Sequence, residues 1–485
     1  MGLPDDAESG PEMGVKMAEK TQGSNIVDWD GPDDPQNPRN WPSLKRNSHV
    51  VFISLFTLYG NLASTMFAPG AGELVQDFGI TSSVLAAFTV SIYLVGYGIG
   101  PLVISPLSEV YGRLPIVHIC NVVFIAFTIG CAASTNTAMF FVFRFIAGSA
   151  CSAPMTIGGA VIADVTTPEK RGKAMSVWAM GPLLGPVVGP IIGGFVAQRL
   201  SWRWSFWIIA ILAGVVFVLS FIVMRETNAA ILLQRKAAKI NREKGEKYLV
   251  VEGDTQQAAR QIIIRAILRP TRLLLFSPIV TLLSLFSAFV FSLIYLLFTT
   301  FPSVFETQYG FSVELSGLAY LGLGIGFCIG IIGFGATNDR IYNKLKGEGE
   351  GTPEMRLPTM MWVSPIVSAG FFWYGWTAYY HVHWIAPIIG TSLIAIGALF
   401  VIMPSQLYLV DAFGPQAAAS ALAANLVVRT LSGAFLTLAG PPLYSSLGLG
   451  WGNSLLGFLG LLFVPIPWLF YRYGKTLRER FVFQP

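Results

Sequence analysis

Apolar residues in this chain form long unbroken runs. The run SPIVTLLSLFSAFVFSLIYLLF over 277–298 contains no charged residue. A helix needs about 20 consecutive apolar residues to cross hydrocarbon, whereas the strands of a membrane barrel alternate apolar and polar positions over about 10 residues. The pattern therefore predicts an all-α integral membrane protein and argues against a barrel.

Twelve such runs are separated by polar stretches. They lie at 49–69, 86–107, 116–134, 138–163, 173–197, 204–224, 277–303, 314–337, 359–378, 384–404, 416–440 and 452–471. A longer polar stretch after the sixth run divides them into two groups of six. The predicted organisation is a disordered cytosolic tail over 1–44, an N-terminal half over 45–224, a cytosolic linker over 225–276, a C-terminal half over 277–472 and a cytosolic tail over 473–485.

Composition and charge agree with a membrane protein. Only 12% of the 485 residues are charged, against about 25% in an ordinary soluble domain. If the N-terminus lies in the cytosol, 28 of the 32 Lys and Arg residues fall on the cytosolic side, as the positive-inside rule requires. The net charge of +5 therefore indicates topology and contact with anionic lipid headgroups, and not nucleic-acid binding.

Glycine and proline recur in register within the fifth run, in the stretch GPLLGPVVGPIIGGF over 181–195. The glycines are Gly181, Gly185, Gly189, Gly193 and Gly194, and the prolines are Pro182, Pro186 and Pro190. A step of four residues drifts by only about 40° per step around a helix, and small residues allow membrane helices to approach closely. The stretch predicts a smooth, bent helix face that either packs as a generic tight helix pair or has a role in transport.

The two halves carry similar charged residues and prolines at the ends of corresponding runs. Acids stand near arginines where the second and eighth runs end, and an aspartate precedes a proline by four residues where the fourth and tenth runs end. The residues are Glu109 with Arg113, Asp339 with Arg340, Asp164 before Pro168, and Asp411 before Pro415. We expect Arg113 to pair with Asp164, and the repeat predicts a binding site between the halves near the membrane midplane.

Arg144 and Arg429 are the charged residues placed inside runs. A charge at the centre of a span costs at least about 2.5–3.5 kcal/mol, so each should face the bundle interior or water. Arg144 could instead extend toward the outer surface, and Arg429 could line a cavity or hold neighbouring helices together. Polar and aromatic residues at similar depth are further cavity candidates: Asn61, Tyr93, Trp178, Phe291, Tyr295, Tyr320, Gln406 and Asn425.

None of the 27 acidic residues falls at the centre of a run. A proton carrier would therefore be an acid at a span edge or a histidine. The candidates are Glu73, Asp77, Asp164, Glu306, Glu314, Asp411, His381 and His383. A polycation would find no buried counter-charge, so we expect neutral or anionic amphiphiles, and not polyamines, as the main substrates.

Five segments resemble the major facilitator superfamily, and more narrowly the twelve-span drug:proton antiporters of fungi. They are DPQNPRNWPSLKR (34–46), SPLSEVYGRLP (105–115), the stretch from RFIAGSACSAPM to GPIIGGF (144–195), PEMRLP (353–358) and YLVDAFGPQAAASALAANLVVRTLSGA (408–434). The segment at 105–115 departs from the family pattern. Ser105 and Glu109 replace the usual Gly and Asp, and Val110 and Leu114 stand where basic residues are usual.

The resemblance implies a proton-coupled secondary transporter that exports small amphiphilic compounds by alternating access. It implies that the Gly–Pro stretch is the antiporter motif that seals the route through the protein. It also implies a cytosolic gate and a link between Arg144 and proton transfer. The gating residues it indicates are Glu109, Gly112, Arg113, Asp164, Asp339 and Arg340.

Other functions remain open at this stage. A nutrient importer or a dedicated organic-acid exporter would share much of the pattern, while a sensor or enzyme would need a signalling domain or catalytic cluster that the sequence lacks. We expect no catalytic residues, metal or organic cofactor, and the proton gradient as the energy source. The expected partners are a small-molecule substrate, protons and membrane lipids. We expect a monomer in the plasma or vacuolar membrane with both termini in the cytosol.

Overall fold

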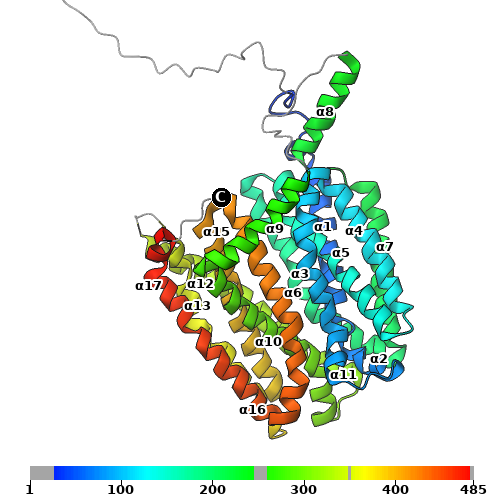
Figure 1. Ribbon diagram of the computed structural model, residues 1–485, viewed down its shortest axis with the longest axis vertical. Coiled ribbons are helices and arrows are strands. Elements are labelled where there is room, and N and C mark those ends of the chain that lie inside the picture. Colours follow the sequence, from blue (N-terminus) through cyan, green and yellow to red (C-terminus); the bar gives the residue numbers. More distant parts are fainter. Residues whose placement is uncertain (1–26, 245–258, 348–350, 481–485) are drawn as a thin grey trace, which may run out of the picture.

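The protein forms an elongated bundle of helices (Figure 1). The computed structural model describes residues 27–244, 259–347 and 351–480, and these residues contain no strand. The helices of the first part are α1 (Ser43–Thr65), α2 (Ala71–Asp77), α3 (Ser83–Tyr111), α4 (Arg113–Ala132), α5 (Thr137–Val165), α6 (Pro168–Arg199) and α7 (Trp202–Val223). Those of the connecting segment are α8 (Ala229–Lys244) and α9 (Ala259–Phe276). Those of the second part are α10 (Pro278–Tyr309), α11 (Val313–Leu318), α12 (Leu321–Lys346), α13 (Pro358–Val363), α14 (Pro365–Tyr379), α15 (Ile385–Leu436), α16 (Gly440–Phe463) and α17 (Pro465–Arg480).

Ten helical segments of the described chain are long and apolar enough to cross a membrane, against the twelve expected. The expected span at 359–378 is divided between α13 and α14, because Pro365 interrupts the helix. Another segment, Ala417–Glu479, is 63 residues long and contains two of the expected spans. Every predicted run is therefore helical, and the difference in number comes from one interrupted helix and one merged pair.

The chain reverses direction within α15 and again within α16. Ile388 near the start of α15 contacts Gly322 at the start of α12, and Asp411 lies beside Arg356 at the other end of the bundle. The chain then returns, because Gly440 packs against Thr300 near the end of α10. In α16 the backbone reverses at Gly448, whose φ is 70°. We call the end of the bundle where α1 begins and α17 ends the terminal end, and the end that carries α2 and α11 the far end (Figure 1).

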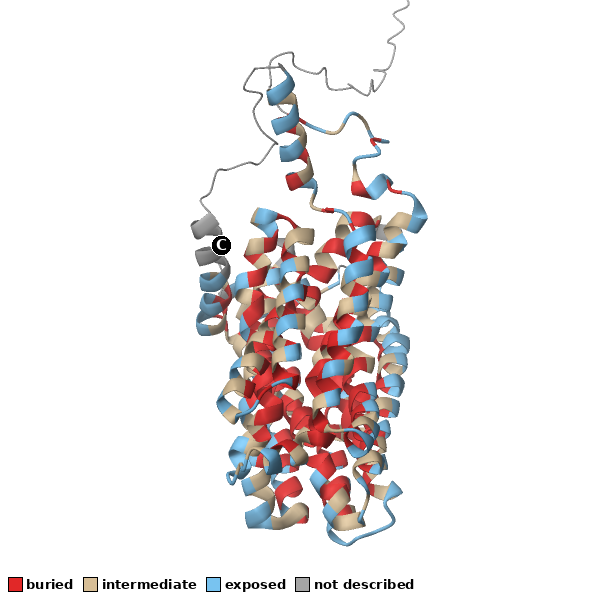
Figure 2. Ribbon diagram, turned by 90° about the vertical axis from the view of Figure 1, so that its right-hand side faces the viewer, coloured by how far each residue is buried: buried red, intermediate tan, exposed pale blue. Residues whose placement is uncertain are grey.

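Buried apolar side chains form separate cores in the two parts of the chain. Two clusters contain residues of 41–224 only, while the largest contains residues of 273–470 together with Leu94 and Val187. Buried residues concentrate along the middle of the bundle, and exposed ones cover its outside and the projecting segment (Figure 2). We therefore describe α1–α7 as the N-terminal group and α10–α17 as the C-terminal group.

The prediction of a disordered tail over 1–44 is wrong for residues 27–44; residues 1–26 lie outside the described part. Backbone N–H groups of Asp30 and Gln36 donate to the Asp34 carboxylate at 3.0 and 2.8 Å and hold its pKa below the usual value. Lys236 of α8 contacts Asp30 at 2.7 Å and Asp34 at 3.6 Å. The described residues of the predicted linker, 225–244 and 259–276, are largely helical. Helix α8 projects from the terminal end, and α9 packs against α3, α10 and α15.

Candidate functional site

A cavity of about 250 Å³ lies between the N-terminal and C-terminal groups. The N-terminal group lines it with Asn61 and Ser64 of α1, Tyr93, Leu94 and Tyr97 of α3, Met155 of α5, and Trp178, Ala179, Pro182, Leu183 and Pro186 of α6. The C-terminal group lines it with Phe291, Ile294, Tyr295 and Phe298 of α10, Phe327 and Ile331 of α12, and Leu399, Ile402, Met403, Gln406, Arg429 and Thr430 of α15. A mostly apolar pocket with a few polar groups is typical of small-molecule sites.

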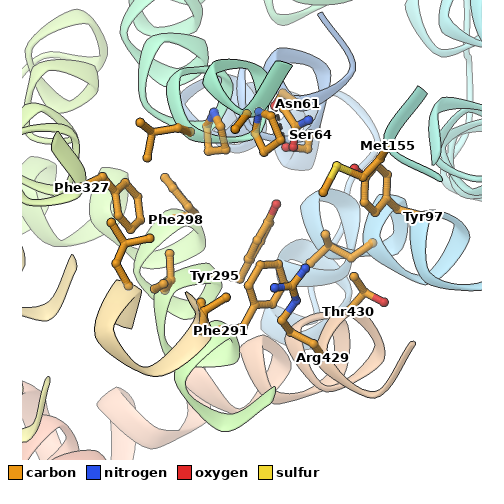
Figure 3. A pocket seen from close by; sticks show the side chains of 18 of the residues that line it. Asn61, Ser64, Tyr97, Met155, Phe291, Tyr295, Phe298, Phe327, Arg429 and Thr430 are labelled. Atoms are coloured by element: carbon orange, nitrogen blue, oxygen red, sulfur yellow. Dashed lines mark hydrogen bonds between the residues drawn. The ribbon is translucent and has the colours of Figure 1, made fainter. Parts of the chain in front are cut away.

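The charged residue of this cavity and two of its phenyl rings lie on different sides. Figure 3 shows Tyr97, Arg429 and Thr430 on one side, with Phe298 and Phe327 on the other. Arg429 is the charged residue among those that line the cavity in the described chain, and no carboxylate lines it. The site is therefore amphipathic and carries a positive charge.

Seven of the nine cavity residues that we predicted line this space: Asn61, Tyr93, Trp178, Phe291, Tyr295, Gln406 and Arg429. Two do not. Tyr320 is buried within the C-terminal group, where its hydroxyl donates to the carbonyl of Phe298 at 2.6 Å. Asn425 is buried as well and donates to Ser284 at 3.3 Å. Both side chains hold helices of one group together and do not face the interface.

The glycines of α6 pack against α1. A Cβ at Gly181 would lie 2.9 Å from the backbone nitrogen of Leu58, and a Cβ at Gly193 would overlap the carbonyl oxygen of Met66. Proline at 190 removes the backbone N–H that would otherwise bond the carbonyl of Pro186. The Thr65 hydroxyl supplies the missing donor at 3.3 Å. The spacing of four residues thus gives α6 a close backbone contact with α1. It also frees the carbonyl of Pro186, which accepts a hydrogen bond from α1.

A second face of α6 joins the C-terminal group at the far end. A Cβ at Gly194 would lie 2.8 Å from the carbonyl oxygen of Val313 in α11, and a Cβ at Gly324 of α12 would lie 2.5 Å from the side chain of Val187. Arg199 Nε lies 3.3 Å from Glu314 Oε2. In the part of the chain that the structure describes, this is the sole ion pair between the two groups. The groups therefore interlock at the far end, beyond the cavity.

Arg144 lies behind the cavity wall and is only 1% exposed. It does not extend to a surface. Its Nη1 and Nη2 donate to the carbonyl oxygens of Ala63 and Ser64 at 2.8 and 3.2 Å. These carbonyls belong to the last turn of α1, where no following backbone N–H is available and the helix dipole is negative. The guanidinium also lies over the Tyr93 ring, 4.8 Å from its centroid. Arg144 thus fixes the end of the helix that carries the cavity residue Ser64.

At the terminal end of the N-terminal group, the predicted pair is present. Arg113 Nε lies 3.7 Å from Asp164 Oδ2, and its Nη1 donates to the Ser108 hydroxyl at 2.9 Å. The Thr227 hydroxyl donates to the same Asp164 oxygen at 3.3 Å. These contacts tie the start of α4 to the end of α5 and to the segment after α7. A gating role for the pair stays a prediction.

Glu226, and not the predicted Glu109, is the acid at the start of α4 in this cluster. Glu109 is exposed and makes no polar contact among the described residues. The buried Glu226 carboxylate accepts hydrogen bonds from the backbone N–H groups of Arg113 and Leu114 at 3.0 and 3.2 Å. A carboxylate at a helix N-terminus satisfies unpaired donors and is favoured by the helix dipole. Gly112 permits this contact, since its φ is 103° and a Cβ there would overlap Glu226.

The two acids can be compared directly by substitution. We expect Glu226→Gln to lower the stability of the folded protein by about 1–2 kcal/mol, because the charged cap of α4 is lost. Glu109→Gln should leave stability unchanged, because that side chain is solvated. The measurement is the thermal unfolding of both purified variants. A larger loss for Glu109→Gln would contradict this assignment.

In the C-terminal group the basic partner is Arg356, not the predicted Arg340. Arg356 Nη1 lies 3.1 Å from Asp339 Oδ1, and its Nε lies 3.1 Å from Asp411 Oδ2. The guanidinium stacks on the Tyr342 ring at 4.0 Å. Arg340 is exposed and forms no ion pair among the described residues. Arg356 therefore connects the last part of α12 to the middle of α15, as Arg113 connects the start of α4 to the end of α5.

None of the edge acids considered as proton carriers lines the cavity. Glu73 and Asp77 accept hydrogen bonds from the backbone and indole N–H groups of Trp202 at 3.0 and 2.8 Å. Glu306 accepts from the Ser316 hydroxyl at 3.2 Å. These three acids hold far-end elements together, which gives each a structural role in the state described here.

Residues 51–437 match the Major Facilitator Superfamily, which is most of the chain and extends from α1 to the end of α15. The chain belongs to this superfamily. Two relatives are the MFS transporter prlG of a fungal species (strain NRRL 50135) and the trichosetin biosynthesis cluster MFS transporter of Gibberella fujikuroi. The first is 59% identical over 95% of this chain and 98% of its own length, and the second 52% identical over 96% and 92%. Both are named as transporters, so this superfamily member is a multi-pass membrane transporter and not an enzyme.

Solved structures agree on the fold of this superfamily member. The crystal structure of a D-xylose–proton symporter superposes with a TM-score of 0.68 over 87% of this chain and 97% of its own, at 18% identity. An identity this low supports the fold alone. The xylose specificity of that protein therefore does not extend to this major facilitator.

Proposed function

We propose that this transporter exports small amphiphilic compounds in exchange for protons, by alternating access through the cavity between its two groups of helices. The observation that carries the proposal is the amphipathic cavity, walled by α6 on one side and closed beyond it at the far end. Rocking of the groups about this site would expose it first at one end of the bundle and then at the other.

The chemistry of the cavity favours drug-like compounds or secondary metabolites over a sugar. Sugars require many directed polar groups, whereas most of this lining is aromatic or aliphatic. One relative is named as the transporter of a trichosetin biosynthesis cluster, which supports a secondary metabolite as substrate. The expected location is the plasma membrane with both termini in the cytosol, and the vacuolar membrane is the alternative.

Direction and coupling can be measured with purified protein in liposomes. A panel of anionic, neutral and cationic amphiphiles would be followed under an imposed pH gradient, with and without a protonophore. Exchange predicts that substrate moves against the direction of proton flow and that the protonophore stops it. Movement with the protons would identify a symporting importer. A rate of substrate movement that does not depend on the pH gradient would identify a uniporter.

The far-end ion pair should contribute little to this cycle. Arg199 is largely exposed, and surface ion pairs contribute roughly 0–1 kcal/mol. We therefore expect Arg199→Ala to change the transport rate by less than about fivefold. The same liposome assay tests this. A loss of more than about tenfold would mean that the pair, and not the backbone contact of α6, holds the far end closed.

A further inference from the structure

Arg429 is a buried cation without a partner. It is 8% exposed, and no hydrogen bond or ion pair among the described residues involves it. Its Nε is buried and unpaired, and the guanidinium lies over the Phe291 ring, 4.9 Å from the centroid. A ring face offsets only part of the cost of removing a cation from water. Arg429 therefore differs from Arg144, which has two carbonyl acceptors.

The unpaired guanidinium faces the cavity. Figure 3 shows it extending from α15 toward Phe291 and Tyr295, within the space that these residues enclose. Arginine stays protonated in proteins and offers a planar set of donors that matches a carboxylate. Because no acid lines the cavity, the counter-charge has to come from what enters it.

The opposite side of the cavity has different chemistry. Phe298 and Phe327 lie away from Arg429. Leu399 also lines the cavity and packs against α12 at Gly330, one turn from Phe327. A ligand held at the guanidinium would therefore place an apolar body against these residues.

We infer that Arg429 is the anion-binding residue of the site and that the substrates are amphiphilic monoanions. A carboxylate or similar delocalised anion would bind at Arg429, with an apolar body against Phe298 of α10, Phe327 of α12 and Leu399 of α15. This inference rests on the proposed function, since it names the substrate class of that cavity. It narrows the sequence prediction of neutral or anionic substrates to anionic ones.

Binding to the purified full-length protein tests the inference with three matched probes: 4-(1-pyrenyl)butyrate, its primary amide and 4-(1-pyrenyl)butylamine. Energy transfer from tryptophan to pyrene reports binding, and Trp178 in the cavity wall is a nearby donor. We expect the anion to bind at least tenfold more tightly than the amide, and the amine to bind weakest.

Substitutions then assign the preference to one side chain. Arg429→Gln should weaken anion binding at least tenfold more than it weakens amide binding, while Arg429→Lys should retain the preference. Gln406→Leu changes a neutral polar residue of the same cavity and should preserve the ratio of anion to amide binding. Equal binding of all probes by the native protein, no binding of any, or unchanged anion binding by a folded Arg429→Gln protein would each overturn the inference.

Transport of the same probes separates this inference from the proposed function. If the anion binds through Arg429 but a pH gradient does not move it, the inference stands and proton-coupled export fails. If the gradient drives the amide or the amine in preference to the anion, export stands and the inference fails.

Discussion

Gly194→Val is expected to abolish transport while leaving the protein folded. The Cβ at this position would lie 2.8 Å from the carbonyl oxygen of Val313 and 3.3 Å from the Cα of Glu314, both in the C-terminal group. A valine would therefore keep the two groups apart at the far end and prevent the state described here from forming. We expect at least a tenfold loss of transport, together with faster hydrogen–deuterium exchange in α11.

Gly193→Val provides a matched control one residue away. Its Cβ would overlap the Met66 carbonyl in α1, within the N-terminal group. This contact is buried in the fold of one group and does not change when the groups separate. We expect Gly193→Val to lower the yield and the unfolding temperature, which Gly194→Val should not do. Normal transport by Gly194→Val would show that far-end closure does not depend on this contact.

The sequence predicts the helices well because lipid imposes a strong rule. Any backbone that crosses hydrocarbon must satisfy its own hydrogen bonds, so long apolar runs become helices. The rule says less about where helices bend or merge. The interruption at Pro365 and the reversal at Gly448 depend on local backbone geometry, and hydropathy does not register either of them.

The cavity was also largely predictable, for a related reason. Polar side chains at mid-span depth avoid lipid, so they face either the cavity or a neighbouring helix. Gln406 and Arg429 face the cavity. Tyr320 and Asn425 instead donate hydrogen bonds to residues of the C-terminal group. Burial depth predicts that such residues point inward, but only the packing of the helices decides between these two outcomes.

Polar clusters at the terminal end were predicted less well, because their partners are distant in sequence. Glu226 is 113 residues from Arg113, and Arg356 is 17 residues from Asp339 and 55 from Asp411. Adjacent residues in the sequence suggested Glu109 and Arg340 instead. A signal was nonetheless present, since Glu226 lies two residues after the sixth apolar run and Arg356 three residues before the ninth.

The same clusters reveal how each group is joined to its last helix. In the N-terminal group, Glu226 after α7 caps the start of α4. In the C-terminal group, Glu354 before α13 accepts two hydrogen bonds from Arg478 of α17, at 3.0 and 3.1 Å. Both contacts lie at the terminal end. In the N-terminal group the acid follows the last helix, α7, whereas in the C-terminal group the acid precedes α13 and the last helix, α17, supplies the arginine. Similar polar residues at the ends of corresponding apolar runs thus indicate where charged contacts form in each group, but not which residue supplies the acid and which the base.

Arg144→Met is expected to abolish transport in every mode, including substrate exchange at equilibrium without a pH gradient. The substitution removes both donors from the carbonyls of Ala63 and Ser64 and leaves them unpaired in the interior. Each unpaired buried carbonyl costs about 1–3 kcal/mol. The end of α1 would then shift, and Ser64 with it, so the cavity itself would change.

This outcome separates a positioning role from a role in proton coupling alone. A residue that acts only in coupling would, when replaced, lose gradient-driven transport and retain equilibrium exchange. Arg203→Met is the control, because Arg203 likewise donates to two carbonyls, those of Ala132 and Ser134, at 2.9 and 2.7 Å. Arg203 does not line the cavity, so its replacement should affect stability and spare exchange. Retained exchange in Arg144→Met would instead assign Arg144 to proton coupling, because its two hydrogen bonds to α1 would then be dispensable for the shape of the cavity.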